Sequence, residues 1–272
     1  MSIQNALNLR REFETQGYVH CRNFFSEAEV FELQKEIRTT GESVRKEDYL
    51  NKGSMIFYSN VFRRSEYVRA FISQKKIVEL LRQVAGPDCW VRWDQCVVKN
   101  PGAPEFPWHQ DNAYNRLKDT HYQLWIGLTE MNERNGGLWL QPGSHTHGLL
   151  PHVRLSNHVR CTRPPENPRL IPAEKGDVIL FSSWMLHHTK RNESDAARWA
   201  YVVEYMSLDD YDPLVKAPYF IVSEGGAPAP RFVTSYRGRT RMKNRIKYLP
   251  LQVKERCKEL ARRLFSLKSS GR

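Results

Sequence analysis

The second half of the chain contains a series of short apolar segments that restricts the possible folds more than any other feature. From residue 89 onward the chain reads CWVRWDQCVVKN, YQLWIGLTEM, GLWLQPGSH, DVILFSSWMLHH and RWAYVVEYMSL. These segments are rich in Val, Ile, Trp and Tyr, which favour strands, and clusters of Gly, Pro, Asn and Asp separate them. Several strands with turn signals between them predict an antiparallel sandwich or barrel.

Helical patterns occupy most of the first 88 residues. Ser26 is followed three residues later by Glu29, and this capping box predicts that a helix begins there. The segments predicted in this part are helices at 5–15, 26–37 and 65–86 (the last one or two helices), a short strand at 17–25, and an irregular polar stretch at 40–65 that is a candidate active-site lid. We therefore predict a mainly β protein with flanking α-helices, in which a double-sheet barrel is buttressed by the N-terminal helices.

The charge of the chain is concentrated at its C-terminal end. Residues 236–272 contain 13 lysines and arginines and 2 acidic residues, a net charge of +11 out of +12 for the whole chain. We predict a single domain over 1–235, with a helical part at 1–88 and a β-barrel core at 89–210, followed by a basic extension over 236–272. Nucleic acid is not an expected partner, because the basic extension has no recognised nucleic-acid-binding motif and basic residues alone are weak evidence.

Several protein classes are excluded by what the sequence lacks. The chain has no run of 18 apolar residues, and its first residues contain no apolar signal core. Five scattered cysteines without a CxxC pair are typical of reduced thiols, so we expect a cytoplasmic protein. Phosphate-binding GxxxxGK[ST] loops, Gly-rich dinucleotide loops and GxSxG elbows are also missing from the sequence.

The stretch WHQDNAY carries a possible metal site. His109 and Asp111 are two residues apart, and on a strand this spacing directs both side chains to the same side. A third ligand is expected from the apolar segment that ends in His187 and His188. Two imidazoles and one carboxylate on one face of a metal are the ligands of non-haem Fe(II) oxygenases. The alternative is a surface turn, or a buried pair in which a histidine is hydrogen-bonded to the aspartate.

Arg198 adds a second chemical requirement. It lies 11 residues after His187, across a polar turn and just inside the next predicted strand. An arginine that points into a barrel needs an anionic partner, because an unpaired buried charge is costly. A dicarboxylate cosubstrate would supply one through a bidentate pair. The alternative is a solvated charge at the end of a strand.

Together these motifs resemble a known family. WHQDNAY, NERNGGLWLQPGSHTHG and KGDVILFSSWMLHHTKRNESDAARWAYVVEY are similar to the phytanoyl-CoA dioxygenase family of Fe(II)/2-oxoglutarate-dependent oxygenases. The opening FETQGYVHCRNFFSEAEVFELQKEI also resembles the N-terminal helix–strand–helix of that family, so the resemblance covers about residues 8–208. It implies a double-stranded β-helix core, a jelly-roll variant related to the cupins.

The resemblance also implies roles for individual residues. His109 and Asp111 match the HxD metal ligands of the family. The distal histidine of the family precedes an asparagine by five residues, and an arginine follows that asparagine by six. Asn192 therefore selects His187 as the third ligand and Arg198 as the partner of the distal 2-oxoglutarate carboxylate.

Other positions are implied less directly. Trp125 matches an aromatic position near the cosubstrate, although it is equally compatible with a plain core role. Gln95 or Cys96 match the strand that contacts the cosubstrate from the other side. His188 remains an alternative as a residue that supports the metal site or faces the substrate.

The chemistry implied by the family is oxidation of an unactivated C–H bond. Fe(II), 2-oxoglutarate and O2 are the expected cofactors, with release of succinate and CO2 and a small molecule as substrate, by default a natural-product intermediate. Asp111 is present where related halogenases have a small residue, so we expect hydroxylation over halogenation, with desaturation and ring formation as alternative outcomes. The alternatives are a non-catalytic metal-binding barrel that recognises a ligand or membrane surface, and an isomerase or hydrolase with another metal. An inward Arg198 favours the oxygenase.

The basic extension contains an amphipathic pattern. After Pro250, apolar residues recur at intervals of four, three, four and three: Val253, Cys257, Leu260, Leu264 and Leu267. One interpretation is a helix that docks on the body of the protein. The other is peripheral contact with a membrane or another anionic surface.

Overall fold

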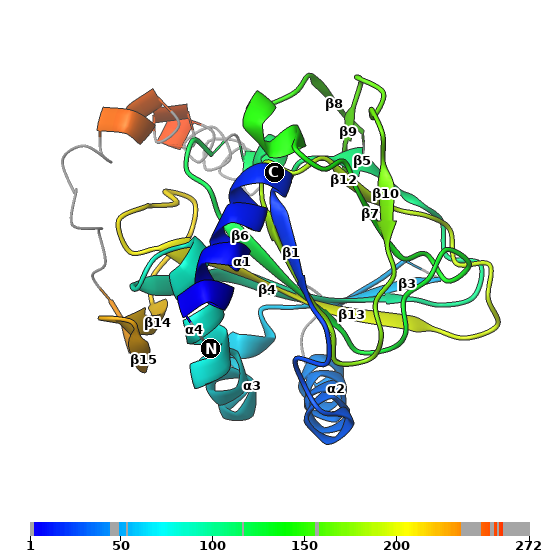
Figure 1. The fold of residues 1–272 in the computed structure, drawn as a ribbon, viewed down its shortest axis with the longest axis horizontal. Coiled ribbons are helices and arrows are strands. Elements are labelled where there is room, and N and C mark those ends of the chain that lie inside the picture. The colour runs from blue at the N-terminus through cyan, green and yellow to red at the C-terminus, as the bar shows by residue number, and fades with distance from the viewer. Residues whose placement is uncertain are drawn as a thin grey trace, which may run out of the picture.

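Two antiparallel β-sheets face each other, and the longer helices lie on the outer side of the larger sheet (Figure 1). The computed structural model describes residues 3–43, 49–52, 54–115, 117–155, 158–234, 246–250, 253–254 and 256–257. The helical elements are α1 (Ile3–Gln16), α2 (Glu27–Glu42), η1 (Val61–Arg63), α3 (Glu66–Ile72), α4 (Lys75–Val84), α5 (Asn112–Asn115) and η2 (Ser144–His147). The strands are β1 (Tyr18–Cys21), β2 (Tyr49–Lys52), β3 (Met55–Ser59), β4 (Cys89–Lys99), β5 (Phe106–His109), β6 (Tyr122–Gly127), β7 (Leu138–Leu140), β8 (His152–Arg154), β9 (Val159–Cys161), β10 (Arg169–Ile171), β11 (Val178–Ser182), β12 (His187–Thr189), β13 (Arg198–Ser207), β14 (Tyr219–Glu224) and β15 (Ala227–Val233).

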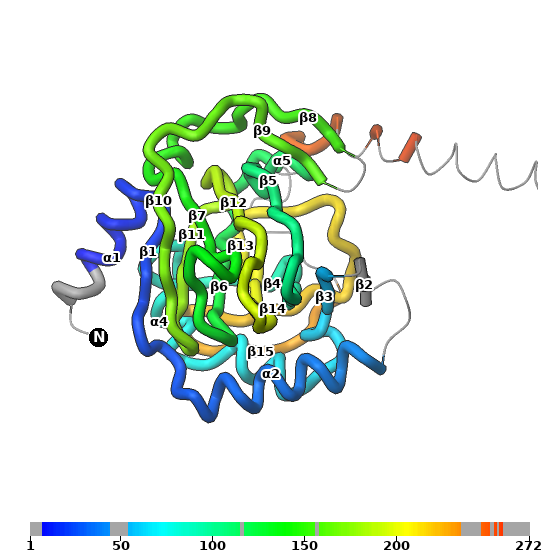
Figure 2. The backbone as a smooth tube through the Cα atoms, turned by 90° about the vertical axis from the view of Figure 1, so that its right-hand side faces the viewer, coloured from blue at the N-terminus to red at the C-terminus, as the bar shows by residue number. Residues whose placement is uncertain are grey.

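The strand order is that of a jelly roll. The larger sheet runs β1-β11-β6-β13-β4-β14-β15, with β3 also paired to β4 and β2 to β3. The smaller sheet runs β10-β7-β12-β5, and β8 pairs with β9. Figure 2 shows the two sheets curling around a common interior. The predicted fold class, mainly β with flanking helices around a jelly-roll core, is confirmed.

The larger sheet takes in more of the chain than the predicted barrel core at 89–210. Strand β1 pairs with β11, and β3 pairs with β4, so the N-terminal part contributes strands as well as helices. Beyond residue 210, β14 extends the sheet on the other side of β4. These pairings join segments far apart in sequence, and short strands carry little signal until a partner strand is known.

Side-chain alternation divides the strands between two interiors. Along β13, Trp199, Tyr201 and Val203 pack with the helices in the main core, whereas Ala200 and Val202 face the space between the sheets. The same alternation follows from the period of two in an extended chain. It places one face of β13 and of its neighbours β4 and β6 toward the smaller sheet, which is where a site between the sheets can form.

The N-terminal predictions are largely confirmed. The capping box is present, since Glu29 N donates to Ser26 Oγ at 3.3 Å and Ser26 N donates to Glu29 Oε2 at 2.9 Å. The segment 65–86 forms two helices, because the chain leaves the helical conformation around Ser73 and Gln74.

The segment 40–65 was predicted to be an irregular lid, but its described part is largely regular. Its described part contains the strands β2 and β3, while residues 44–48 and 53 lie outside the described residues. Met55 and Phe57 of β3 line a cavity, and Tyr58 packs in the core. Pairing with β4 explains the difference, because a long neighbouring strand organises a segment whose own pattern is weak.

A short piece of the basic extension is anchored to the body. Tyr248 is 2% exposed, and its hydroxyl donates to Asp119 Oδ2 at 2.5 Å. The hydroxyl oxygen of Tyr248 accepts hydrogen bonds from the backbone N–H of Lys118 at 3.2 Å and of Asp119 at 3.1 Å. The side chain of Lys247 also pairs with Asp119. Most of the predicted amphipathic segment after Pro250 lies outside the described residues. Among the helices that are described, none has the length and apolar character needed to cross a membrane.

We predict that Tyr248→Phe loosens this anchor. The substitution leaves the Asp119 carboxylate and two backbone N–H groups without the hydroxyl, a local cost of about 1–3 kcal/mol. Limited trypsin digestion followed by mass spectrometry should show faster cleavage after Lys247. The control is Tyr67→Phe, at a tyrosine that is 42% exposed on α3. Equal cleavage rates in both variants would contradict the anchor.

Candidate active site

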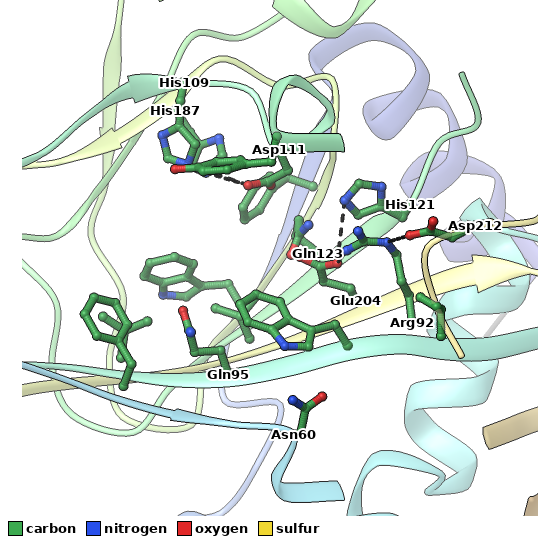
Figure 3. A pocket seen from close by; sticks show the side chains of 18 of the residues that line it. Asn60, Arg92, Gln95, His109, Asp111, His121, Gln123, His187, Glu204 and Asp212 are labelled. Carbon is green, nitrogen blue, oxygen red and sulfur yellow. Dashed lines mark hydrogen bonds and ion pairs between the residues drawn. The ribbon is translucent and has the colours of Figure 1, made fainter. Parts of the chain in front are cut away.

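His109, Asp111 and His187 meet at one point between the sheets (Figure 3). Strands β5 and β12 are antiparallel neighbours, and His187 stands directly opposite His109 in their register. Asp111 Oδ1 lies 3.6 Å from His109 Nε2 and 3.8 Å from His187 Nε2. One ligand atom from each residue falls within 4.8 Å of the others, which suits three ligands of a single ion.

The two members of the HxD motif converge for a different reason from the one expected. Strand β5 ends at His109, so Asp111 lies in the turn that leads into α5, and the pleat of a strand does not align the two side chains. The intervening Gln110 fixes this turn. Its Nε2 donates to Gly148 O at 2.8 Å and to Trp184 O at 2.6 Å, and its Oε1 accepts from Leu150 N at 2.8 Å.

Backbone carbonyls orient both imidazoles toward the centre. The Nδ1 atom of His109 lies 2.8 Å from Pro107 O, and that of His187 lies 3.0 Å from Met185 O. A carbonyl can only accept, so each Nδ1 carries the proton and each Nε2 is left with a free lone pair. This arrangement around a ligand histidine is usual in metal sites.

The protonation states also suit a cation. Burial would raise the pKa of Asp111, but the imidazoles of His187 and His109 outweigh it and hold that pKa well below its usual range. Burial and the neighbouring His109 lower the pKa of His187 to about 4. At neutral pH the aspartate is therefore ionised and His187 is neutral, as metal ligands must be.

His188 faces away from this cluster. Its ring stacks on Trp108 with the ring centroids 4.9 Å apart, and its Nδ1 lies 2.9 Å from Phe106 O. It reaches the edge of the cavity without approaching the ligand atoms of the other three residues. Of the two adjacent histidines, the structure brings only His187 into the group.

Arg198 is buried beside the cavity with unused hydrogen-bond donors. It is 1% exposed, and its Nη2 donates to Gly136 O at 3.0 Å, whereas its Nε and Nη1 have no hydrogen-bond partner in the part of the chain that the structure describes. Its guanidinium carbon lies 5.5 Å from the centre of the Trp125 ring, and burial lowers its pKa to about 10. Two orphaned N–H groups on a buried cation fit the carboxylate of a bound ligand.

Lys99 is a second buried basic residue in this corner, and it was not singled out from the sequence. It lies opposite Arg198 in the pairing of β4 with β13, and it is fully buried. Its Nζ donates to Thr189 Oγ1 at 3.1 Å, and burial together with Arg198 lowers its pKa to about 6. Gln95, Val97 and Lys99 alternate along one face of β4, so the period of two was the available signal.

The remaining predicted residues separate by face. Gln95 lines the cavity, and its Nε2 donates to Ser59 Oγ at 2.9 Å. Cys96, its neighbour on β4, points into the main core, so Gln95 alone remains a candidate for cosubstrate contact. Trp125 both lines the cavity and packs in the core between the sheets, where its Nε1 lies 3.1 Å from Met131 Sδ.

The cavity has a volume of about 720 Å³ and is bordered by both the triad and a polar cluster. Arg92, Glu204, Asp212, His121 and Gln123 gather at one side of it, and none of them was singled out from the sequence (Figure 3). They come from β4, β6, β13 and the segments before β6 and after β13. Only the sheet arrangement brings these positions together.

We predict that Lys99→Met stabilises the ligand-free protein, and more so at lower pH. The pKa of Lys99 falls from 10.5 to about 6 on folding. Above pH 10.5 the amine is neutral in both the folded and the unfolded state, so there is no buried charge to destabilise the fold. The cost grows as the pH falls and is complete below about 6. The gain in unfolding free energy on substitution should therefore increase between pH 10 and pH 6, as measured by denaturant titration. Lys75→Met, at an exposed lysine of α4, is the control; a pH-independent gain would contradict the argument.

Comparison with known proteins agrees with the geometry. Residues 13–200, well over half of the chain, match the phytanoyl-CoA dioxygenase (PhyH) family. A probable alpha-ketoglutarate-dependent hypophosphite dioxygenase of Stutzerimonas stutzeri is 26% identical over 223 residues, 74% of this chain and 78% of the relative. The peroxisomal phytanoyl-CoA dioxygenase of Rattus norvegicus is 23% identical over 233 residues, 75% of this chain and 69% of the relative.

Solved structures share the fold. The non-haem monooxygenase ThoJ superposes with a TM-score of 0.70 at 18% identity, covering 90% of this chain and 96% of the other. The epimerase SnoN, in complex with Fe3+, alpha-ketoglutarate and nogalamycin RO, gives a TM-score of 0.66 at 20% identity, covering 85% of this chain and 98% of the other. With the family match, the jelly-roll fold and the His–Asp–His cluster together, the chain belongs to the phytanoyl-CoA dioxygenase family of Fe(II)/2-oxoglutarate-dependent dioxygenases.

Proposed function

We propose that this dioxygenase hydroxylates an unactivated C–H bond of a small organic molecule, with release of succinate and CO2. The observation that carries the proposal is the pairing of a His109–Asp111–His187 cluster with the orphaned donors of Arg198 beside one cavity. A metal-binding barrel without catalysis has no use for a buried guanidinium with two free N–H groups. Membership of the phytanoyl-CoA dioxygenase family independently favours an enzyme over a non-catalytic barrel.

In this proposal the three ligand residues hold Fe(II), and the iron with 2-oxoglutarate and O2 supplies the oxidising chemistry. His109 and His187 present Nε2 to the metal, because the carbonyls of Pro107 and Met185 hold the other ring nitrogens. Asp111 supplies the carboxylate and occupies the position that a halogenase would leave open. A complete set of three protein ligands therefore supports hydroxylation over halogenation.

Arg198 is proposed to hold the distal carboxylate of 2-oxoglutarate through Nε and Nη1. Lys99 is positioned by Thr189, which lines the cavity, and it would add a second positive charge by taking up a proton when an anion binds nearby. Trp125 covers the guanidinium on the cavity side, and Gln95 reaches the cavity from β4. An anion bound here would relieve the burial cost of both cations.

The size of the cavity supports a substrate of natural-product dimensions. About 720 Å³ lies within the range of pockets that enclose a drug-sized ligand, roughly 300–1,000 Å³. SnoN is described with nogalamycin RO, and a further structural neighbour, EctD, with 5-hydroxyectoine. We propose a secondary-metabolite intermediate as the substrate.

The first test is anaerobic titration of the protein with Fe(II) and then 2-oxoglutarate. We expect the visible charge-transfer absorption of iron-chelated 2-oxoglutarate to develop with saturation. Asp111→Ala should abolish the band, since it removes a metal ligand. Arg198→Met should weaken the apparent affinity for 2-oxoglutarate by about tenfold or more, corresponding to about 1.4 kcal/mol or more.

Matched controls are Asp209→Ala and Arg169→Met, at exposed residues outside the cavity. Neither should change the titration. Bound iron without the band in the unmodified protein would reject the oxygenase proposal, and an unchanged affinity in Arg198→Met would reject the assigned carboxylate site.

The second test follows turnover. Removing metal with a chelator should abolish succinate formation from 2-oxoglutarate in air, and added Fe(II) should restore it, whereas Zn(II) should not, because zinc has no redox chemistry. Succinate is measured by mass spectrometry. Succinate formation that persists in the metal-free protein would contradict a reaction at the His109–Asp111–His187 cluster.

A further inference from the structure

Arg92 is held between two carboxylates in the wall of the active-site cavity. Its Nε donates to Asp212 Oδ2 at 2.6 Å, and its Nη1 pairs with Glu204. The three side chains are 10% exposed or less, so solvent screens their charges weakly. One guanidinium and two carboxylates leave the group with a net charge of −1, and burial raises the pKa of Glu204 despite the contact with Arg92.

His121 enters the same part of the cavity. It is 1% exposed, and neither of its ring nitrogens has a hydrogen-bond partner among the described residues. Its Nε2 lies 3.7 Å from Glu204 Oε2, which is beyond hydrogen-bond distance. Burial and the charge of Arg92 lower the pKa of His121 to about 3, so at neutral pH the ring is neutral and offers one donor and one acceptor.

Gln123 repeats this pattern one step further along the sheet. It is 2% exposed, and its amide approaches the Glu204 carboxylate and favours its ionised form, but its Nε2 has no hydrogen bond of normal geometry to any described residue. Gln110 provides a comparison, because it is a buried glutamine with a structural role and its amide makes three hydrogen bonds to the protein. Unsatisfied nitrogens on two buried residues that line a cavity indicate a surface that contacts a ligand.

The charges of this region restrict what that ligand group can be. A phosphate, phosphonate or carboxylate would be repelled by the net negative charge of Arg92, Glu204 and Asp212. Among the described residues, the other lysine and arginine side chains that line the cavity are Arg63, which is half-buried and donates to Pro218 O, and Lys216, which is exposed. An anionic group of a ligand would therefore bind more favourably elsewhere in the cavity than beside Arg92, Glu204 and Asp212.

We infer that His121, Gln123 and Glu204 form a substrate subsite for a polar group that donates hydrogen bonds and carries no negative charge, such as a hydroxyl or an ammonium group. This inference rests on the proposed function and names the substrate class of that site. Asp111 and His121 line the same cavity, so the polar group would be bound in the cavity that contains the metal centre.

The rest of the cavity suits a carbon skeleton. Its apolar lining comes from both sheets and from the segment after β13, and includes Phe57, Trp93, Phe106, Phe181, Val202 and Leu214. The subsite would therefore read one polar substituent on an otherwise apolar molecule. That arrangement fixes orientation through few polar contacts, as is usual for small-molecule pockets.

The test compares three probes with a similar skeleton: 2-phenylethanol, 2-phenylethylamine and phenylacetate. Each is titrated anaerobically into the Fe(II)- and 2-oxoglutarate-loaded protein, and its dissociation constant is read from the change in the charge-transfer absorption and from calorimetry. We expect the alcohol and the amine to bind at least about tenfold more tightly than phenylacetate. His121→Phe and Gln123→Leu, tested separately, should each reduce that preference to about threefold or less.

The exposed His147 provides the matched control, since His147→Phe should keep the full preference. Variants are compared only where the Fe(II)–2-oxoglutarate band is retained, which shows that the protein is folded. Equal affinities, tighter binding of phenylacetate, or no measurable binding of the alcohol and the amine would overturn the subsite while leaving the oxygenase proposal intact. Absence of the band in the unmodified protein would instead overturn the proposed function itself.

Discussion

The antiparallel pairing of β5 with β12 is the constraint on which the site depends. It sets His187 opposite His109 at the ends of two short strands, and the turn after β5 then brings Asp111 to both imidazoles. β12 is itself held by β7 on its other side, so the smaller sheet fixes the position of His187 from two directions. The register of three short strands thus determines whether three ligands can reach one ion.

The cavity separates charge of opposite sign around this centre. On one side Arg198 is buried as a cation, and Lys99, whose pKa is lowered to about 6, lies beside it and can take up a proton, which suits an anionic cosubstrate. On another side Arg92 is outnumbered by Glu204 and Asp212. Because the interior screens charge weakly, the two regions would favour different ligands. In the proposed binding mode, the dicarboxylate lies at the positive corner and a neutral or cationic substituent lies at the negative one.

Some features could be read without a structure because they are local. The capping box of α2 follows from Ser26 and Glu29 alone, and the strands from residue 89 onward follow from composition and turn residues. His187 and Arg198 belong to strands that are consecutive in the chain and separated by one turn. Their spacing is therefore a local motif, and the family resemblance was enough to single out both residues. The strand at 55–59 was missed because its order comes from pairing with β4.

The sequence by itself therefore determined the fold class, the family and the candidate ligands, since these depend on short-range patterns and a motif of fixed spacing. Only the tertiary structure decided that Asp111 reaches the metal position from a turn, that Cys96 faces the core, and that Lys99 lies against Arg198. It alone also assembled the cluster around Arg92. The physical reason is that sheet register and side-chain alternation join residues more than 100 positions apart, such as Arg92 and Asp212, and no local pattern encodes those contacts.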